Sequence, residues 1–185
     1  VIYYTQSGQL HEIANQIAKP FLNDKAIDLT FHEIKLKKPF PFPWDNDSFF
    51  GAFPESFLQI PSDLEPVPTE ILEKKYDLIL FHYQVWYLSP SIPITSFLKS
   101  EEAKILLDNT PTITISGSRN MWIMAQEKVK TLLKHNNAQL KGNIALVDRT
   151  GNLISVITIV EWMFSGKKKR YLGIFPMPKK KKKDI

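Results

Sequence analysis

The sequence of 185 residues contains no cysteine, which excludes disulfides, iron–sulfur ligation and thiolate catalysis. This absence suits a reducing compartment, so we expect a cytoplasmic protein, with a peripheral position at the inner membrane surface as the alternative. No signal peptide is visible in the residues given, and no apolar run among them reaches the ~20 residues needed to cross a bilayer. Its four histidines have no ligand spacing with carboxylates, so we predict no metal site.

Positive charge is scarce outside the last residues of the chain. Residues 1–166 carry 15 Lys and Arg against 18 Asp and Glu, a net charge of −3, whereas residues 167–185 carry nine basic residues against Asp184, a net charge of +8. Nucleic-acid-binding folds spread their positive charge over a face of the domain, so we predict no nucleic-acid partner. We interpret 167–185 as a solvated basic tail, with weak contact to an anionic membrane surface as the functional alternative.

The first residues of the chain carry the most information. In Ile2–Leu10, an apolar run that predicts a buried strand passes into a turn with hydroxyls and a glycine, and then into a helical pattern. The first N–H groups of a helix have no carbonyl partner and lie at the positive end of its dipole, so this turn can hold a phosphate. Gly8 lets the backbone approach the ligand closely. Because the loop has no Lys or Arg, we expect a phosphomonoester rather than a triphosphate with magnesium.

This loop resembles the phosphate loop of the flavodoxin family. The matching positions are Tyr3, Thr5, Gly8, Ala14 and Ile17. Leu10 stands where the family has a hydroxyl, which puts one hydrogen bond to the phosphate in doubt. The resemblance implies a flavodoxin-like fold and an FMN cofactor. The chain opens inside the predicted strand without an initiator methionine, so we expect a few residues to precede it in the full protein.

Strand and helix patterns alternate along the rest of the chain. Further strands are predicted over Ile27–Ile34, Tyr76–Phe81, Pro111–Ser116 and Asn143–Val147, and further helices over Ser91–Leu107, Met121–His135 and Asn152–Phe164. Short connections between such units imply right-handed crossovers. We therefore predict an α/β, doubly wound, five-stranded parallel sheet with helices on both faces. The flavodoxin resemblance implies the strand order 2-1-3-4-5. The sheet and its helices would form a single flavodoxin-like domain over 1–166.

One segment, Leu36–Pro68, breaks the alternation. It holds more than half of the chain's 13 prolines, interleaved with seven aromatic residues. Proline at this density argues against a long helix or a central strand. Each aromatic side chain left in water would forgo roughly 1.5–3 kcal/mol of burial, so the segment must pack on the domain or on a partner. A structural flap over a sheet edge and a substrate lid remain equal alternatives.

Topology predicts where the rest of a ligand would lie. In an open parallel sheet, ligands bind beyond the carboxyl ends of the strands, where the loops after the third and fourth predicted strands flank the phosphate loop. These loops contain Trp, Tyr, Gly and Asn, which suit a planar ring system that needs stacking faces and amide hydrogen bonds. We predict FMN, with its phosphate at Thr5, Gln6, Ser7, Gly8, Gln9 and Leu10, and its ring among Gln84, Val85, Trp86, Tyr87, Gly117, Ser118, Arg119, Asn120 and Trp122.

Arg119 has several possible roles beside the pyrimidine edge of a flavin. It could stabilise negative charge on the reduced ring, or dock a nicotinamide phosphate or an acidic substrate; the alternative is a surface salt bridge. No catalytic residue is assigned.

A second resemblance extends over nearly the whole chain. The segments Tyr3–Leu10, Pro41–Trp44, Gln84–Pro93, Ser118–Lys128 and Tyr171–Pro176 are similar to flavodoxin-fold bacterial proteins identified as dialkylresorcinol condensing enzymes. The resemblance implies a place beside ketosynthase-type enzymes that make aryl polyene or resorcinol lipids. Condensing enzymes of that type hold the acyl chain on a cysteine, which this sequence lacks. Members of this family run longer, so we expect a further carboxyl-terminal segment.

Three functions remain open at this stage. The first is an FMN-dependent oxidoreductase or electron-transfer protein that works with NAD(P)H or a redox partner protein. The second is a condensing or cyclising enzyme for fatty acyl-derived substrates, with Leu36–Pro68 as its acyl-binding lid. The third is a non-catalytic flavodoxin-like adaptor.

Overall fold

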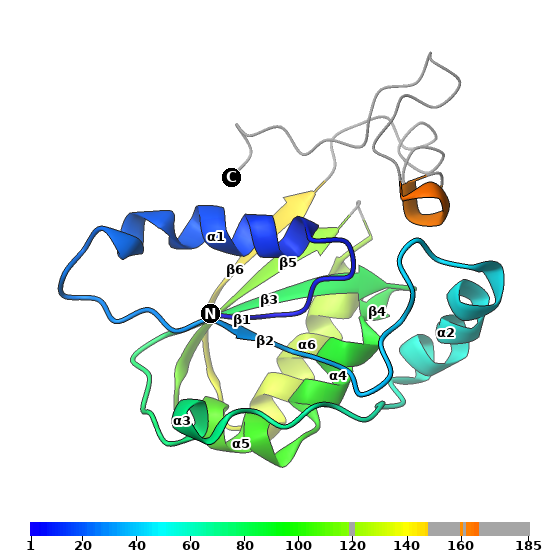
Figure 1. The fold of residues 1–185 in the computed structure, drawn as a ribbon. Coiled ribbons are helices and arrows are strands. Elements are labelled where there is room, and N and C mark those ends of the chain that lie inside the picture. The colour runs from blue at the N-terminus through cyan, green and yellow to red at the C-terminus, as the bar shows by residue number, and fades with distance from the viewer. Residues whose placement is uncertain (119–120, 148–159, 161, 167–185) are drawn as a thin grey trace.

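A computed structural model of the chain describes residues 1–118, 121–147, 160 and 162–166. Among these residues, five strands form a parallel sheet in the order β2-β1-β3-β5-β6 (Figure 1). They are β1 (Ile2–Tyr3), β2 (His32–Glu33), β3 (Ile79–Trp86), β5 (Pro111–Ser118) and β6 (Gln139–Val147). The short strand β4 (Ser89–Pro90) pairs antiparallel with the end of β3. This arrangement confirms the predicted order 2-1-3-4-5.

Helices cover both faces of the sheet (Figure 1). One face carries α1 (Gln9–Leu22), and the other carries α3 (Thr69–Leu72), α4 (Ile92–Leu98), α5 (Glu101–Leu107) and α6 (Ile123–His135). The remaining helix, α2 (Asn46–Leu58), lies beside the carboxyl end of β3 and next to β4. None of the helices in the described ranges combines the length and the apolar content that a membrane span requires. The predicted helix Asn152–Phe164 falls mostly outside these ranges, as does the basic tail.

The core forms on both sides of the sheet because side chains alternate along each strand. Phe81 of β3 is fully buried and joins Phe97 of α4 in the larger cluster, on the face covered by α4–α6. Leu80 points the opposite way and packs with Leu10 and Ile13 of α1. This alternation fixes which β3 side chains face α1, including the polar ones nearer the carboxyl end.

Two predicted elements are shorter or interrupted. Of the predicted strand Ile27–Ile34, only the two residues of β2 pair with β1. The predicted helix Ser91–Leu107 is divided into α4 and α5. Ser100 begins the second helix, because its side chain accepts a hydrogen bond from the Ala103 N–H (3.2 Å) and caps the new first turn.

The prediction that the prolines of Leu36–Pro68 exclude a long helix is wrong. The 13-residue helix α2 lies within this segment, with Pro54 inside it. Asp45 caps the helix by accepting a hydrogen bond from the Ser48 N–H (2.7 Å). Pro54 cannot bond to the carbonyl of Phe50, but Phe50 is 66% exposed, so water can replace the missing donor.

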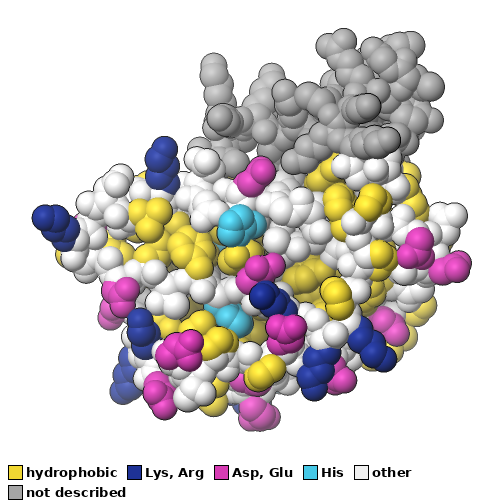
Figure 2. Space-filling view, viewed as in Figure 1, with side chains coloured by type: hydrophobic (Ala, Val, Ile, Leu, Met, Phe, Trp, Pro, Cys, Tyr) yellow, Lys and Arg dark blue, Asp and Glu magenta, His cyan; other side chains and the backbone are white. Residues whose placement is uncertain are grey.

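On the face seen in Figure 2, Lys and Arg side chains are interspersed with Asp and Glu, and hydrophobic side chains show between them. The described part of this face therefore presents no single basic surface.

A buried polar contact joins β3 to α6. The Tyr83 hydroxyl donates to Oε1 of Gln126 (2.6 Å), and both residues are buried. In Tyr83→Phe the amide oxygen loses its closest donor, so we expect the free energy of unfolding to fall by about 1–3 kcal/mol in urea titrations. Tyr76→Phe is the matched control, because Tyr76 donates to the Ile71 carbonyl (3.1 Å) from a half-buried position. Equal losses in the two variants would contradict this prediction.

Candidate functional site

The loop between β1 and α1 presents a run of unpaired donors. Within the described ranges, no hydrogen bond is made by the main-chain N–H groups of residues 6–11, and the first paired N–H at the start of α1 is that of Glu12, which donates to the Gly8 carbonyl (3.1 Å). Gly8 has φ = 80°, a left-handed conformation that turns the chain into the helix. A Cβ placed on Gly8 would meet no atom within 4 Å, so the space in front of the loop is open. Such a group of amides at a helix N-terminus can hold an anion.

The side chains of the six predicted phosphate residues differ in what they offer. Thr5 has a buried hydroxyl with no hydrogen-bond partner, so it can donate to a ligand. Ser7 and Gln9 are half-buried. Leu10 is only 2% exposed and packs in the core under α1, which leaves its main-chain N–H as its only donor. Hydroxyl and amide groups therefore make up the loop, as its sequence predicts.

Gln6 connects this loop to the proline- and aromatic-rich segment. Its Nε2 donates to the carbonyls of Phe40 (3.0 Å) and Pro41 (2.8 Å), and its Oε1 accepts from the Tyr4 hydroxyl. The Gln6 side chain is thus fully occupied within the protein. Only its main-chain N–H remains available for a ligand.

The segment predicted as the loop after the third strand, His82–Pro90, is mostly strand. β3 continues to Trp86, and a tight turn at Tyr87 (φ = 48°) and Leu88 (φ = 62°) leads into β4. The predicted strand Tyr76–Phe81 was placed too early because polar residues such as His82 and Gln84 interrupt the apolar run. The four predicted ring contacts, Gln84, Val85, Trp86 and Tyr87, therefore lie at the end of a hairpin and are half-buried.

Trp86 is the centre of an aromatic cluster at this end of the sheet. Its ring lies 5.4 Å from that of Phe40, 5.3 Å from that of Trp44 and 6.1 Å from that of Tyr4, all edge to face. Its Nε1 donates to Oε1 of Gln84 (3.1 Å). The proline- and aromatic-rich segment thus packs on the domain, directly beside the start of the phosphate loop.

Helix α2 is held to the hairpin by polar contacts as well. The Tyr87 hydroxyl donates to the Phe49 carbonyl (2.5 Å), and Ser56 donates to the Trp86 carbonyl (3.0 Å). Lys128 of α6 donates to the Phe57 carbonyl (3.1 Å). These bonds fix α2 over the outer side of the hairpin, on the same edge of the sheet as the phosphate loop.

The third predicted loop begins inside β5, which extends two residues beyond its predicted end. Gly117 pairs with Gln84, and Ser118 is the last residue of the strand. The Ser118 hydroxyl is buried without a hydrogen-bond partner. Trp122 is half-buried at the start of α6. Arg119 and Asn120 lie outside the described residues, so their predicted roles remain predictions.

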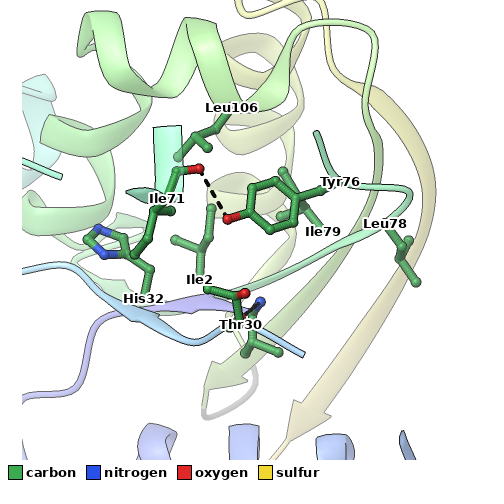
Figure 3. A pocket seen from close by; sticks show the side chains of 9 residues that line it. Ile2, Thr30, His32, Ile71, Tyr76, Leu78, Ile79 and Leu106 are labelled. Atoms are coloured by element: carbon green, nitrogen blue, oxygen red, sulfur yellow. Dashed lines mark hydrogen bonds between the residues drawn. The ribbon is translucent and has the colours of Figure 1, made fainter. Parts of the chain in front are cut away.

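A small hollow lies at the opposite end of the sheet (Figure 3). Ile2, His32 and Ile79 line it at the amino ends of their strands, together with Ile71 and Leu106 from α3 and α5. The Tyr76 hydroxyl crosses it to bond with the Ile71 carbonyl (3.1 Å). Its lining is mainly apolar and includes none of the predicted FMN contacts.

No sequence pattern singles out His82, which the structure places in the middle of β3. It is fully buried, and neither of its ring nitrogens has a hydrogen-bond partner. Burial lowers the pKa of His82 to about 3. The imidazole is therefore neutral at physiological pH.

Comparison with known proteins shows the fold. No family model matches the sequence, and no curated protein matches it significantly. A flavoprotein from Lactobacillus acidophilus, solved in complex with FMN, matches at a TM-score of 0.60 and 18% identity over 78% of this chain and 89% of that one. The fold is flavodoxin-like.

Two further solved structures agree. A candidate flavoprotein from Bacteroides eggerthii matches at a TM-score of 0.60 and 13% identity, over 78% of this chain and 85% of that one. Another from Bacteroides uniformis matches at 0.58 and 16% identity, over 91% and 96%. Likeness at these identities concerns the fold, and function has to be argued from the site.

The buried His82 makes the stability of the ligand-free protein depend on pH. Its pKa is about 3 in the folded chain and about 6.5 when unfolded, so the unfolded chain binds a proton that the folded chain does not. Stability should therefore fall as the pH decreases from about 6.5 towards about 3, by at most about 1.4 kcal/mol per unit. We expect the free energy of unfolding in urea to fall more steeply with decreasing pH in the wild type than in His82→Leu. Parallel pH profiles for the two proteins would refute it.

The Gln6 side chain should hold residues 40–41 against the phosphate loop. Gln6→Ala removes both hydrogen bonds to this segment, so we expect faster amide hydrogen exchange in residues 44–58, measured by mass spectrometry. Gln16→Ala, an exposed change in α1, is the control and should leave exchange there unchanged. If Gln6→Ala exchanges like the control, the segment is held by its aromatic contacts alone.

Proposed function

We propose that this protein binds FMN and acts as an oxidoreductase or electron-transfer protein. The observation that carries the proposal is the loop after β1, in which the N–H groups of residues 6–11 have no partner among the described residues and the Thr5 hydroxyl is buried and likewise unpaired there. Buried or clustered donors of this kind are rare in a folded protein unless a ligand or water accepts hydrogen bonds from them. Their place, at the carboxyl edge of a parallel sheet, is where this architecture binds ligands.

The phosphate of FMN fits the loop in chemistry as well as in place. The main-chain N–H groups of Gln6, Ser7, Gly8, Gln9 and Leu10 would donate to it, with the hydroxyls of Thr5 and Ser7. Gly8 leaves open space beside its own backbone, where an added Cβ would meet no described atom within 4 Å. The absence of Lys and Arg from this loop favours a singly attached phosphate, whose charge the helix dipole and neutral donors can offset.

The flavin ring would lie along the ends of β3 and β5. Gln84, Val85, Trp86 and Tyr87 would border it from the hairpin, and Gly117, Ser118, Arg119, Asn120 and Trp122 from the other side. The Trp86 ring already packs on three aromatic side chains, so it would form a wall of the site rather than a free stacking plate. The unpaired Ser118 hydroxyl would donate to the ligand at this edge.

Bound there, FMN would supply hydride or single-electron transfer, and the chain's own residues would bind it, orient it and limit its contact with water. We propose NAD(P)H or a redox partner protein as the electron source. The resemblance to proteins of dialkylresorcinol metabolism supports a role beside aryl polyene or resorcinol lipid synthesis. Cytoplasmic localisation, with weak contact of the basic tail to anionic membranes, remains part of the proposal.

The test is whether the purified protein binds FMN through the proposed loop. We expect the visible absorption bands of a flavin, either in the isolated protein or after addition of FMN. Gly8→Ala should weaken FMN binding by roughly tenfold, because alanine at φ = 80° costs about 1–2 kcal/mol and the loop would relax away from its binding shape.

Gly51→Ala is the matched control, since Gly51 lies in α2 with open space around it and alanine favours helix. It should leave FMN affinity unchanged. A wild-type protein that stays colourless and does not quench FMN fluorescence at saturating concentration would refute the proposed function.

A further inference from the structure

His82 has no place in the proposed contacts, yet it is the most isolated polar side chain near them. It is fully buried in β3, and both ring nitrogens lack a partner. A neutral imidazole carries one N–H donor and one acceptor, and leaving such groups unpaired in the interior is costly. Buried polar groups of this kind need a specific explanation.

The sheet register places His82 on the face covered by α1. His82 is paired with Tyr3 of β1, and paired residues point to the same side of a sheet. Tyr3 reaches α1, because its hydroxyl lies 2.8 Å from Nδ1 of His11. Leu80, two residues before His82 and therefore on the same face, packs against Leu10 and Ile13.

The same geometry sets how far along the sheet His82 lies. Two residues of strand advance by about 6.6 Å, so His82 stands about one helical turn nearer the carboxyl edge than Leu80. Leu10 and Ile13 share a cluster with Leu80 and with Ile115, which pairs with His82, so His82 lies level with the first turns of α1, which runs back along the sheet from the carboxyl edge (Figure 1). The unpaired N–H groups of the loop begin there, as does the unpaired hydroxyl of Thr5.

We propose that the imidazole N–H of His82 donates to the phosphate held by this loop, from the floor of the site. The inference rests on the proposed FMN function and adds a buried donor from the central strand. It compensates for Leu10, whose side chain is apolar where related phosphate loops carry a hydroxyl. The donor is neutral, in keeping with a loop that has no Lys or Arg. Burial supports this by favouring the uncharged ring.

The experiment compares FMN with riboflavin, which lacks the phosphate, by quenching of flavin fluorescence. His82→Leu should weaken FMN binding by roughly 10- to 100-fold, the value of one hydrogen bond to a charged group, and riboflavin binding by less than about threefold. His82→Gln keeps an N–H donor and should recover most of the FMN affinity. His32→Leu is the matched control, a strand histidine on the opposite face of the sheet, where its ring lies beside Phe97 of α4, and should bind FMN like the wild type.

The outcomes separate this inference from the proposed function. If the wild type binds FMN and His82→Leu binds it equally well, His82 makes no phosphate contact and the function stands. If His82→Leu loses FMN and riboflavin in parallel, the role in phosphate binding is also refuted. A wild type that binds no FMN refutes both proposals.

A spectrum of the unmodified chain keeps the test valid should the variants fold poorly. With the histidine nitrogens labelled by ¹⁵N, FMN should shift the His82 side-chain resonance and riboflavin should not. An unchanged resonance under saturating FMN would overturn the inference.

Discussion

The parallel pairing of β1 with β3 is the constraint on which the site depends. Only two residues of β1 take part, but their register, Ile2 with Phe81 and Tyr3 with His82, fixes the loop after Tyr3 beside the end of the central strand. β5 continues the same alignment through Gly117. Because all three strands run the same way, their carboxyl ends meet, and the first turn of α1 is brought to that edge. A shift of one residue would turn His82 away from α1 and towards the larger core.

The proline- and aromatic-rich segment borders the proposed site without being a strand of the sheet. Trp44 and Ala52 are buried with Ile92 of α4, so the segment is anchored in a hydrophobic cluster of its own. Gln6 then joins it to the phosphate loop, and Ser56 joins it to the hairpin. Loop, hairpin and segment are therefore mechanically connected. A ligand that orders one of them would also restrict the others.

Periodicity predicted the parallel sheet because buried strands here are mostly apolar and the helices are amphipathic, and the flavodoxin resemblance supplied the strand order. It failed where polar residues serve a buried strand. His82 and Gln84 lie inside β3, although their polar side chains predict a loop when composition alone is considered. In the hairpin that follows, Tyr87 and Leu88 adopt the left-handed conformation that glycine or asparagine usually adopts. The sequence therefore contains no residue that predicts this turn. α2 was missed because proline density outweighed the Asp45 cap.

The conformation of the predicted phosphate loop was easier to predict than the roles of its residues. Apolar periodicity and Gly8 correctly predicted a turn between a buried strand and a helix, since local conformation there depends on the chain itself. The roles of Gln6, Leu10 and Trp86 depend on tertiary contacts with residues far away in sequence, which a single sequence does not reveal.

An anion site without a cation has a physical consequence for a redox protein. A lysine at the phosphate would bind it strongly in any state, but would also add a fixed positive charge near the flavin. In the proposed site, amides, hydroxyls and a neutral imidazole would hold the phosphate by short-range hydrogen bonds, which weaken steeply with distance and angle. Such a loop recognises the shape and position of the phosphate more than its charge. The electrostatic environment of the flavin ring would then depend on the residues at the ends of β3 and β5. Substitutions there would change the properties of the ring without changing how the phosphate is bound.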